Sequence, residues 1–475
     1  MQRRGLLFIG MARAVSAILG FVAVPIYTSF LSPEVYGTYA LVLAWVALAK
    51  AAMFHWSASA AARLYPQHLA APEVLVGGAL RLWVLGAALA TGGCLLSLPL
   101  VSPETWRLVA TGTALLLALS AYELALEFVR SALRPGLYAA AVVMSSIVSL
   151  LVGVAAAAHG FGVRAPLLGA IVGYTMGLVV MIWQGRLKAQ WPRNPASRNA
   201  LDAAMFAYGF PLAGGLVLAM AIPAVERHLV AAELGMRDLG IYAAAYGLVF
   251  PAVTVLASVV NISGYPLIVR AHEAVDLAAR TLRLGHQVST LAALLAPALF
   301  GVWLLADDLA QALPREEYAS VSTLLPWIAA AAVMNALRGA YTDLAFHLKR
   351  TTGWIAVSLG TALLIDAASN RALLSRIGIL GAAIALCASY AAALLLSIVV
   401  GARHVRLPPP SRRCLLPITA GLLLMWLTLS RLTVAHSVGG LVLSAVAGAL
   451  AYGMGYWACS LCGRARTPAA TKGTP

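Results

Sequence analysis

The chain has 475 residues, of which 61% are hydrophobic and only 11% are charged. Soluble globular domains are about half apolar and about a quarter charged, so this composition excludes a soluble protein. The formal net charge of +16 does not indicate nucleic-acid binding, because the basic residues stand in short loops between apolar runs and not in one patch or arm.

Long apolar runs recur along the whole chain, and most reach the ~18 residues that a helix needs to cross the hydrocarbon core. They predict an all-α polytopic membrane protein with about 14 transmembrane helices. In chain order, the expected spans are 5–30, 36–58, 76–100, 107–133, 137–158 and 165–185, then 204–232, 240–262, 282–305, 322–346, 353–370 and 378–400, and a final pair at 414–430 and 438–461. The first run is too long for the core of a signal peptide, so we expect it to stay as an uncleaved span.

Lys and Arg are distributed unequally between the predicted loops. With the N-terminus inside, 22 of the 33 Lys and Arg residues fall in or beside cytoplasmic segments, and only seven fall in outer segments. Because Lys and Arg accumulate on the cytoplasmic side of membrane proteins, this bias supports the span count. It predicts that the N and C termini are both cytoplasmic.

Two short segments match at a constant offset of 203 residues. Leu31–Ala40 reads LSPEVYGTYA and Leu234–Ala243 reads LGMRDLGIYA, so Leu, Gly, Tyr and Ala coincide. One segment follows the first span and the other follows the seventh, both on the outer side, which predicts two parallel six-helix repeats. The predicted domains are an N-terminal lobe at 1–185, a cytoplasmic linker at 186–203, a C-terminal lobe at 204–400, and two extra helices with a cytoplasmic tail at 401–475.

Ionisable residues inside predicted spans are candidates for function. A charge at bilayer depth costs roughly 2.5–3.5 kcal/mol on insertion scales and tends to face a cavity or a partner. In the tenth span, Asn335, Arg338 and Thr342 share one helical face, and we expect them to contact substrate or line a cavity. Asp343 is a poor partner for Arg338, because five residues is an unfavourable spacing on an α-helix.

Three further cations are candidates for a substrate-binding cavity. Arg13 lies in span one and Lys50 in span two, and for both, cavity lining and snorkelling to the cytoplasmic surface are equal alternatives. Arg227 belongs to the triplet Glu226-Arg227-His228 near the outer end of span seven. Successive helical residues point about 100° apart, so the three cannot all line one cavity. Substrate contact and a structural lock between the lobes are equal alternatives for the triplet.

Two acidic residues are candidates for ion coupling. Glu123 lies near the middle of span four, where a carboxyl group could carry a proton, and Glu226 is the acid of the triplet. No cofactor and no metal site are expected, and coupling to H⁺ or Na⁺ is left open. Cys459 and Cys462 form a CxxC sequence without a second pair or a His partner, so they are interpreted as small apolar core residues.

The segment LSPEVYGTYAL after the first span resembles the Leu-Ser-x-Glu-x-Tyr-Gly-x-Tyr signature of the polysaccharide-transport branch of the MOP (MATE-like) flippase superfamily. Three later elements resemble that family's seventh span and the turn after it: Gly209-Phe210-Pro211, Glu226-Arg227 in place of the usual Asp-Arg, and Gly240-Ile241-Tyr242-Ala243-Ala244-Ala245. EEYASVSTLLPW (Glu316 to Trp327) and IGILGAAIA (Ile377 to Ala385) are similar to its later spans.

The resemblance implies a Wzx-type flippase of the bacterial inner membrane. Such a protein moves an undecaprenyl-pyrophosphate-linked oligosaccharide between leaflets, for O-antigen, capsule or exopolysaccharide synthesis, by alternating access of two lobes around a cationic cavity. The implied partners are the lipid-linked oligosaccharide, membrane lipid, and the polysaccharide polymerase and chain-length machinery, with no nucleic acid.

Other interpretations stay open. One is another MOP transporter, either a lipid II flippase or a cation-coupled small-molecule exporter. A membrane glycosyltransferase or polymerase is less favoured, because the chain shows no nucleotide-binding, nucleophile-elbow or metal motif. Asp307-Asp308 has no further acid at metal-binding spacing and is interpreted as a helix-end cap.

Overall fold

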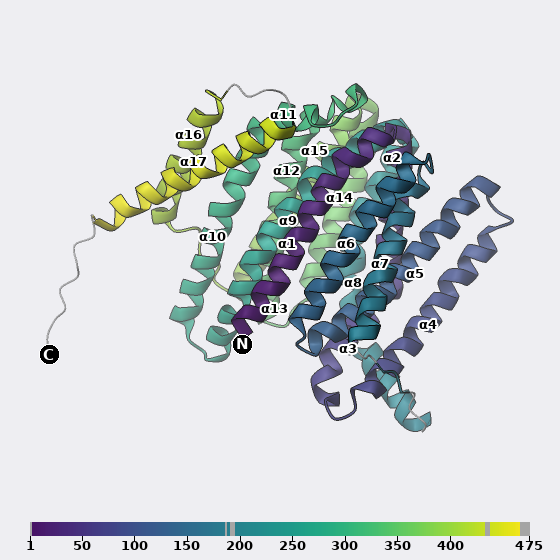
Figure 1. Ribbon diagram of the computed structural model, residues 1–475. Coiled ribbons are helices and arrows are strands. Elements are labelled where there is room, and N and C mark those ends of the chain that lie inside the picture. The colour runs from purple at the N-terminus through teal and green to yellow at the C-terminus, as the bar shows by residue number, and fades with distance from the viewer. Residues whose placement is uncertain (1, 186–187, 191–194, 433–437, 466–475) are drawn as a thin grey trace. The chain divides into compact units, whose positions relative to one another are not determined.

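The computed structural model describes residues 2–185, 188–190, 195–432 and 438–465. Parts of the predicted linker (186–187 and 191–194) and of the predicted tail (466–475) lie outside the described residues. The described residues form helices and no β-strand (Figure 1). Thirteen of the described helices are long and apolar enough to cross a membrane. The prediction of an all-α polytopic membrane protein is therefore confirmed.

The chain divides into two compact units. Unit 1 comprises Met1–Ala244 with Asp366–Ala382, and unit 2 comprises Ala245–Ile365 with Ala383–Pro475. The helices that begin in unit 1 are α1 (Gln2–Phe30), α2 (Pro33–Met53), α3 (His55–Leu64), η1 (Tyr65–His68), α4 (Pro72–Ser97), α5 (Pro103–Ser131), α6 (Pro135–Ala158), α7 (Arg164–Gly185), α8 (Pro195–Leu234), α9 (Met236–Glu273) and α15 (Ile379–His404). Those that begin in unit 2 are α10 (Leu277–Leu304), α11 (Ala306–Gln311), η2 (Glu316–Tyr318), α12 (Val321–Leu337), η3 (Arg338–Thr342), α13 (Leu344–Leu348), α14 (Gly353–Ile377), α16 (Arg412–Leu429) and α17 (Val438–Ala465). The predicted lobe boundaries at 185, 204 and 400 stay a prediction.

Several predicted spans differ from the helices observed, among them α9, which continues to Glu273, beyond the expected end at 262. The span expected at 36–58 is divided at Phe54, whose backbone (φ −125°, ψ −34°) leaves the helical region and separates α2 from α3. Helix α8 begins at Pro195, before the expected start at 204, so a first stretch with Arg198, Asn199 and Asp202 precedes the apolar part of the same helix. The span expected at 322–346 is interrupted by the π-helical turn η3.

Helix α14 accounts for the difference between about 14 expected spans and 13 candidates. It is 25 residues long, which is enough to cross the bilayer at 1.5 Å per residue. However, its apolar run contains Asp366 and Asn370, and it is not among the candidate spans. These two polar residues are both fully buried.

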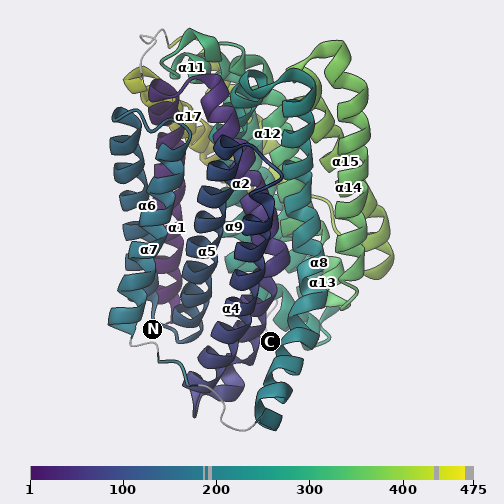
Figure 2. The ribbon, with the colours of Figure 1, turned by 90° about the vertical axis from the view of Figure 1, so that its right-hand side faces the viewer.

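Unit 1 is held together by close helix packing. Helices α1, α5, α6 and α7 lie side by side (Figure 2). Helix α7 carries Gly169, Gly173 and Gly177 on one face, and each lies directly against α6 or α5. A Cβ atom at Gly173 would lie 2.8 Å from Ser149 N and closer still to Ser145 O. Small residues at such positions let two backbones approach, which is a principal source of helix association in membranes.

Replacement of Gly173 by Leu is therefore expected to destabilise unit 1 by about 1–3 kcal/mol, the usual cost of overpacking a tight contact. The measurement is the Tm of the purified protein in detergent. Gly93→Leu is the matched control, because a Cβ atom at Gly93 on α4 meets nothing within 4 Å. An equal Tm for the two variants would contradict the packing role of Gly173.

Candidate functional site

A buried acidic cluster lies in unit 1, formed by Glu226 on α8, Tyr242 on α9, and Asp366 and Asn370 on α14. All four side chains are fully buried. The Tyr242 hydroxyl donates a hydrogen bond to Glu226 Oε1 at 2.5 Å. Asp366 lies close enough to Glu226 for the two carboxyl groups to interact electrostatically. Asn370 Nδ2 donates to the Asp366 backbone carbonyl at 3.0 Å, which fixes its side chain beside the carboxyl group.

Several oxygens of the acidic cluster lack a hydrogen-bond partner within the described part of the chain. They are Glu226 Oε2, both carboxylate oxygens of Asp366, and Asn370 Oδ1. A buried polar atom without a partner costs about 1–3 kcal/mol, and a buried charge costs more. A bound proton or a small cation would remove this cost, and oxygen ligands are those that hard cations prefer. The arrangement thus offers carboxylate and amide oxygens to a proton or a small cation.

Sequence reasoning singled out Glu226 in this cluster but missed Asp366 and Asn370. Both lie at the end of the expected span at 353–370. Their spacing of four residues in an otherwise apolar run places both on one face of the helix. That pattern was an available signal, but nothing local connects α14 with Glu226.

The two residues after Glu226 have different surroundings, as the 100° rotation per residue requires. Arg227 lies near the Tyr36 and Tyr39 hydroxyl groups of α2, close enough for electrostatic interaction. His228 is exposed, and its ring meets the Trp45 ring edge-to-face with centroids 6.0 Å apart. The triplet therefore contributes one buried acid, one half-buried cation and one exposed imidazole.

Lys50 and Glu123, which the sequence assigned to different roles, form an ion pair. Lys50 Nζ on α2 lies 2.6 Å from Glu123 Oε1 on α5. The two side chains keep 18% and 31% of their exposure, so the pair is accessible although both residues belong to candidate spans. His55 lies within electrostatic reach of both. An anion that reaches this point can take the Lys50 ammonium from Glu123.

In unit 2, Arg338 contacts Asn335, Thr342 and Asp343. Contact of this group with substrate or a cavity stays a prediction. Arg338 Nη1 donates to Asp343 Oδ2 at 2.5 Å, and its Nη2 donates to Asn335 Oδ1 at 3.0 Å. Ser397 on α15 donates to Asp343 Oδ1 at 3.2 Å. Arg338 is only 7% exposed, so in this conformation it is an enclosed, paired cation.

The expectation that Asp343 is a poor partner for Arg338 was wrong, because the helix is not α-helical at this point. Asp343 N donates to Arg338 O across five residues at 2.9 Å, as in a π-helix. This wider turn brings Arg338 and Asp343, at positions i and i+5, onto the same side of the helix. Gln287 Nε2 on α10 donates to Ala340 O at 3.1 Å and stabilises the turn from outside the helix. Single π turns of this kind are frequent at functional sites.

Arg13 lies on the exposed face of α1. Its Nε donates to the Tyr138 hydroxyl at 3.1 Å, and Tyr138 stands in the first turn of α6. Gly5 lies against Pro135, the first residue of that helix. The Ser16–Ser146 hydrogen bond at 2.8 Å has the same offset as the Gly5–Pro135 contact, so the Arg13 backbone lies level with Val143, inside α6. Cavity lining and snorkelling therefore stay equal alternatives for Arg13.

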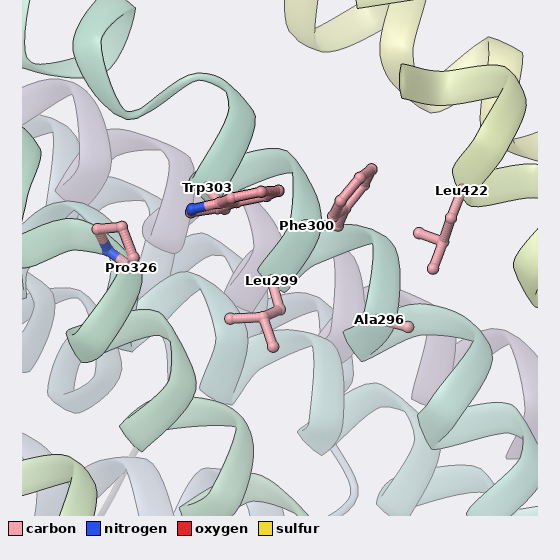
Figure 3. Close-up of a pocket in the computed structure, with 6 residues that line it drawn as sticks. All are labelled: Ala296, Leu299, Phe300, Trp303, Pro326 and Leu422. Atoms are coloured by element: carbon pink, nitrogen blue, oxygen red, sulfur yellow. The ribbon is translucent and has the colours of Figure 1, made fainter. Parts of the chain in front are cut away.

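An apolar groove of about 400 Å³ lies in unit 2 between α10, α12 and α16. Figure 3 shows Ala296, Leu299, Phe300 and Trp303 following one another along α10, with Pro326 and Leu422 on the facing helices. No polar side chain is among these six lining residues. Such a surface suits hydrocarbon and offers no charged group to a phosphate.

A family model described as "Polysaccharide biosynthesis protein" matches residues 87–322. No curated protein sequence matches the chain. Among solved structures, the chain is similar to a lipid II flippase, MurJ, in an inward closed conformation, with a TM-score of 0.73 and 14% identity over 97% of this chain and 100% of that one.

The chain is also similar to an inward-facing multidrug resistance MATE family transporter of the MOP superfamily, with a TM-score of 0.63 and 12% identity over 83% of this chain and 97% of that one. A MOP superfamily transporter from Pyrococcus furiosus gives a TM-score of 0.53 and 12% identity over 84% and 95% of the two chains. At these identities, the similarity is one of fold.

Proposed function

We propose that this chain, which matches a polysaccharide biosynthesis family over residues 87–322 and has the fold of MurJ and of a MATE transporter, is a MOP-type flippase that moves an undecaprenyl-pyrophosphate-linked oligosaccharide across the bacterial inner membrane for surface polysaccharide synthesis. The observation that carries the substrate class is the match of residues 87–322 to polysaccharide biosynthesis proteins. The three solved structures with a similar fold are flippases and transporters, which supports translocation over the making of a glycosidic bond.

The polar headgroup and the polyprenyl chain of the proposed substrate match two different kinds of surface in the protein. Its diphosphate and sugars cannot cross ~30 Å of hydrocarbon unaided, whereas its polyprenyl chain is soluble in hydrocarbon. Arg and Lys side chains bind phosphate oxygens through charge-assisted hydrogen bonds. The apolar groove in unit 2 would accept the chain or the acyl chain of a neighbouring lipid.

Lys50 is the cation best placed to exchange partners, because its ion pair with Glu123 stays partly exposed. In the absence of substrate, Glu123 neutralises Lys50 at 2.6 Å. A diphosphate carries more charge than a single carboxylate and would compete for the ammonium. Because Glu123 remains as the returning partner, binding would stay modest and the lipid could leave.

Replacement of Lys50 by Met is expected to weaken binding of undecaprenyl diphosphate about tenfold or more, since a charge-assisted hydrogen bond contributes about 1.5–3 kcal/mol. Glu123→Gln is expected to tighten the same binding, because it removes the competitor. Both are measured by titrating purified protein in nanodiscs and following its tryptophan fluorescence. Equal affinities for the parent protein and Lys50→Met would remove Lys50 from the proposed site.

The acidic cluster would supply the driving force by binding H⁺ or Na⁺. Its unpartnered carboxylate oxygens favour a cation in the resting protein. Release of that cation would leave two carboxylates facing each other, and their repulsion would favour a different arrangement of α8 and α14. In this proposal, a cation gradient biases the direction of transport.

The decisive experiment is deletion of the gene in its host. Lipid-linked repeat units should then accumulate on the cytoplasmic leaflet, and surface polysaccharide should be lost. Normal export from the deletion strain would contradict the proposal.

A lipid II flippase is the second candidate, favoured by the full-length similarity to MurJ. The two functions are separated by the lipid that accumulates after deletion. Polysaccharide repeat units support the first proposal, and lipid II with arrest of cell-wall synthesis supports the second. Cooperation with a polysaccharide polymerase and chain-length machinery is part of the first proposal only.

A further inference from the structure

Aromatic side chains from α3 and α8 meet at the predicted cytoplasmic end of unit 1. The Trp56 ring on α3 lies edge-to-face with the Phe206 ring on α8, with centroids 5.6 Å apart. Phe206 stacks on Phe210, with centroids 4.8 Å apart and ring planes inclined by 16°. Phe206 and Phe210 are 52% and 57% exposed. The three rings therefore form an accessible aromatic surface.

Close packing of α3 against α8 holds this surface in place. A Cβ atom at Gly209 would lie 2.9 Å from the Trp56 carbonyl carbon and closer still to Trp56 O, so glycine is required for the approach of the two helices. Leu201 and Met205 lie on the same face of α8 as Gly209, at intervals of four residues, and are buried in a core with residues of α3, α4 and α5. Phe206 and Phe210 each follow a residue of that packed face and lie at its edge.

An ion pair lies next to the rings. Asp202 is four residues before Phe206 and eight before Phe210, so the three side chains follow one another along α8. Asp202 Oδ2 pairs with Arg81 Nη2 on α4. The other carboxylate oxygen, Asp202 Oδ1, is buried and has no hydrogen-bond partner within the described part of the chain. We refer to Trp56, Arg81, Asp202, Phe206 and Phe210 as the platform.

The groups of the platform suit a sugar better than an acyl chain or a phosphate. A sugar ring has a face of C–H groups that packs on aromatic rings, and hydroxyl groups at its edge that donate to a carboxylate. An acyl chain can cover the rings but offers no donor to Asp202 Oδ1. A phosphate brings only further negative charge to that oxygen.

The platform also differs from the aromatic belt that many membrane proteins have at the interface. Such belts consist of Trp and Tyr, because these rings carry a polar tip. Phe206 and Phe210 carry none, and they stack on each other beside a charged pair. An interfacial anchor does not account for this combination.

We propose that the platform binds the sugar of the lipid-linked oligosaccharide that is nearest to the diphosphate. This proposal rests on the proposed function and names the part of the protein that recognises the glycan. Trp56 is six residues after Lys50, at most about 9 Å along α2 and α3 at 1.5 Å per residue. His55, directly before Trp56, lies within electrostatic reach of Lys50 and Glu123. A diphosphate bound at Lys50 would thus carry its first sugar toward the rings.

The platform would give the protein a selectivity that Lys50 alone cannot provide. A diphosphate and a polyprenyl chain are common to the loaded carrier and to the bare carrier, so a cation does not distinguish between them. Only the loaded carrier has a sugar for the platform. Selectivity is a difference between two affinities, and the sugar supplies that difference here.

The test measures the contribution of the sugar alone. Purified protein is mixed with equal amounts of undecaprenyl diphosphate and of the same lipid carrying N-acetylglucosamine, glucose or galactose, and native mass spectrometry gives the ratio of the two bound lipids. The parent protein should favour at least one of the sugar-bearing lipids about fivefold or more, equivalent to about 1 kcal/mol. Phe210→Leu should bring this ratio close to unity, because it keeps an apolar side chain and removes the ring. Asp202→Asn should lower the ratio by at least half, because an amide is a weaker acceptor.

Phe8→Leu is the matched control, because Phe8 on α1 is another phenylalanine of unit 1 with a similar exposure of 55%. It should keep the ratio of the parent protein. The variants should all bind undecaprenyl diphosphate alone as the parent protein does, since Lys50 and Glu123 are unchanged. If Phe210→Leu does not accumulate, Phe206→Leu takes its place.

The possible outcomes separate the platform from the proposed function. If the parent protein binds undecaprenyl diphosphate but gains nothing from any of the three sugars, the platform is overturned and the proposed function stands. A sugar preference that persists in both Phe210→Leu and Asp202→Asn, or that is lost equally in Phe8→Leu, would also overturn the platform. A parent protein that binds none of these lipids would contradict the proposed function, and the platform with it.

Discussion

Transport by Glu226→Gln or Asp366→Asn protein is expected to lose its response to a cation gradient, and its rate should fall at least tenfold, equivalent to about 1.4 kcal/mol or more. An amide keeps the shape of the carboxyl group but can neither bind H⁺ nor neutralise Na⁺. The measurement is flipping of a fluorescent lipid-linked oligosaccharide in proteoliposomes, with a pH gradient or a Na⁺ gradient imposed separately. The arm that accelerates the parent protein identifies the coupling ion.

The control for this experiment is Asp307→Asn, which removes an exposed acidic group on α11. It should respond to the gradients as the parent protein does. A full gradient response in Glu226→Gln and Asp366→Asn would mean that the acidic cluster is a structural feature of unit 1. Loss of the response in the Asp307→Asn control as well would indicate a general effect of net charge.

The second large effect is expected at Arg338. Arg338→Ala should destabilise the protein by about 3–5 kcal/mol, because it leaves the buried Asp343 carboxylate without its cation. The change is measured as a lower Tm of the purified protein and a smaller folded fraction. The double variant Arg338→Met, Asp343→Leu should regain most of the stability, since it removes both charges and fills a similar volume.

Export by the double variant then separates two roles that a single substitution cannot distinguish. If the stable double variant exports normally, Arg338 serves only to hold the π turn against Asp343 and Ser397. If it is stable but does not export, the guanidinium contacts substrate in a conformation in which the pair has opened. A double variant as unstable as Arg338→Ala would contradict the argument from the uncompensated carboxylate.

The membrane class and most of the spans could be predicted because they depend on local composition. An apolar run of sufficient length is a helix wherever its neighbours lie, since no alternative satisfies the backbone in hydrocarbon. The exceptions are also physical. The break at Phe54 and the π turn at Arg338–Thr342 depend on contacts between helices, which an apolar run does not encode.

The candidate site was only partly predictable for the same reason. Glu226, Lys50 and Arg338 stand out because a charge in an apolar run is conspicuous. Their partners could not be recognised from local sequence. Asp366 lies on another helix than Glu226, Glu123 was a candidate for ion coupling and not a partner of Lys50, and the spacing from Arg338 to Asp343 is favourable only in a π turn. Local sequence shows which groups need a partner, and tertiary packing decides which partner they receive.

The contact between the first turns of α2 and α9, where Gly37 lies against Met236 and Gly240 against Pro33, also bears on the origin of the two matching segments at 31–40 and 234–243. If one six-helix chain had once paired with an identical copy, residue 34 would have faced itself across the symmetry axis, and either two Glu or two Arg would have repelled each other. Joining the copies in one chain lets corresponding positions diverge, and here they carry opposite charges, Glu34 and Arg237. Gly37 and Gly240 have no such freedom, because each lies on the other copy's backbone. Corresponding positions are thus expected to differ where two charged side chains face each other, and to be identical where the two backbones are in contact.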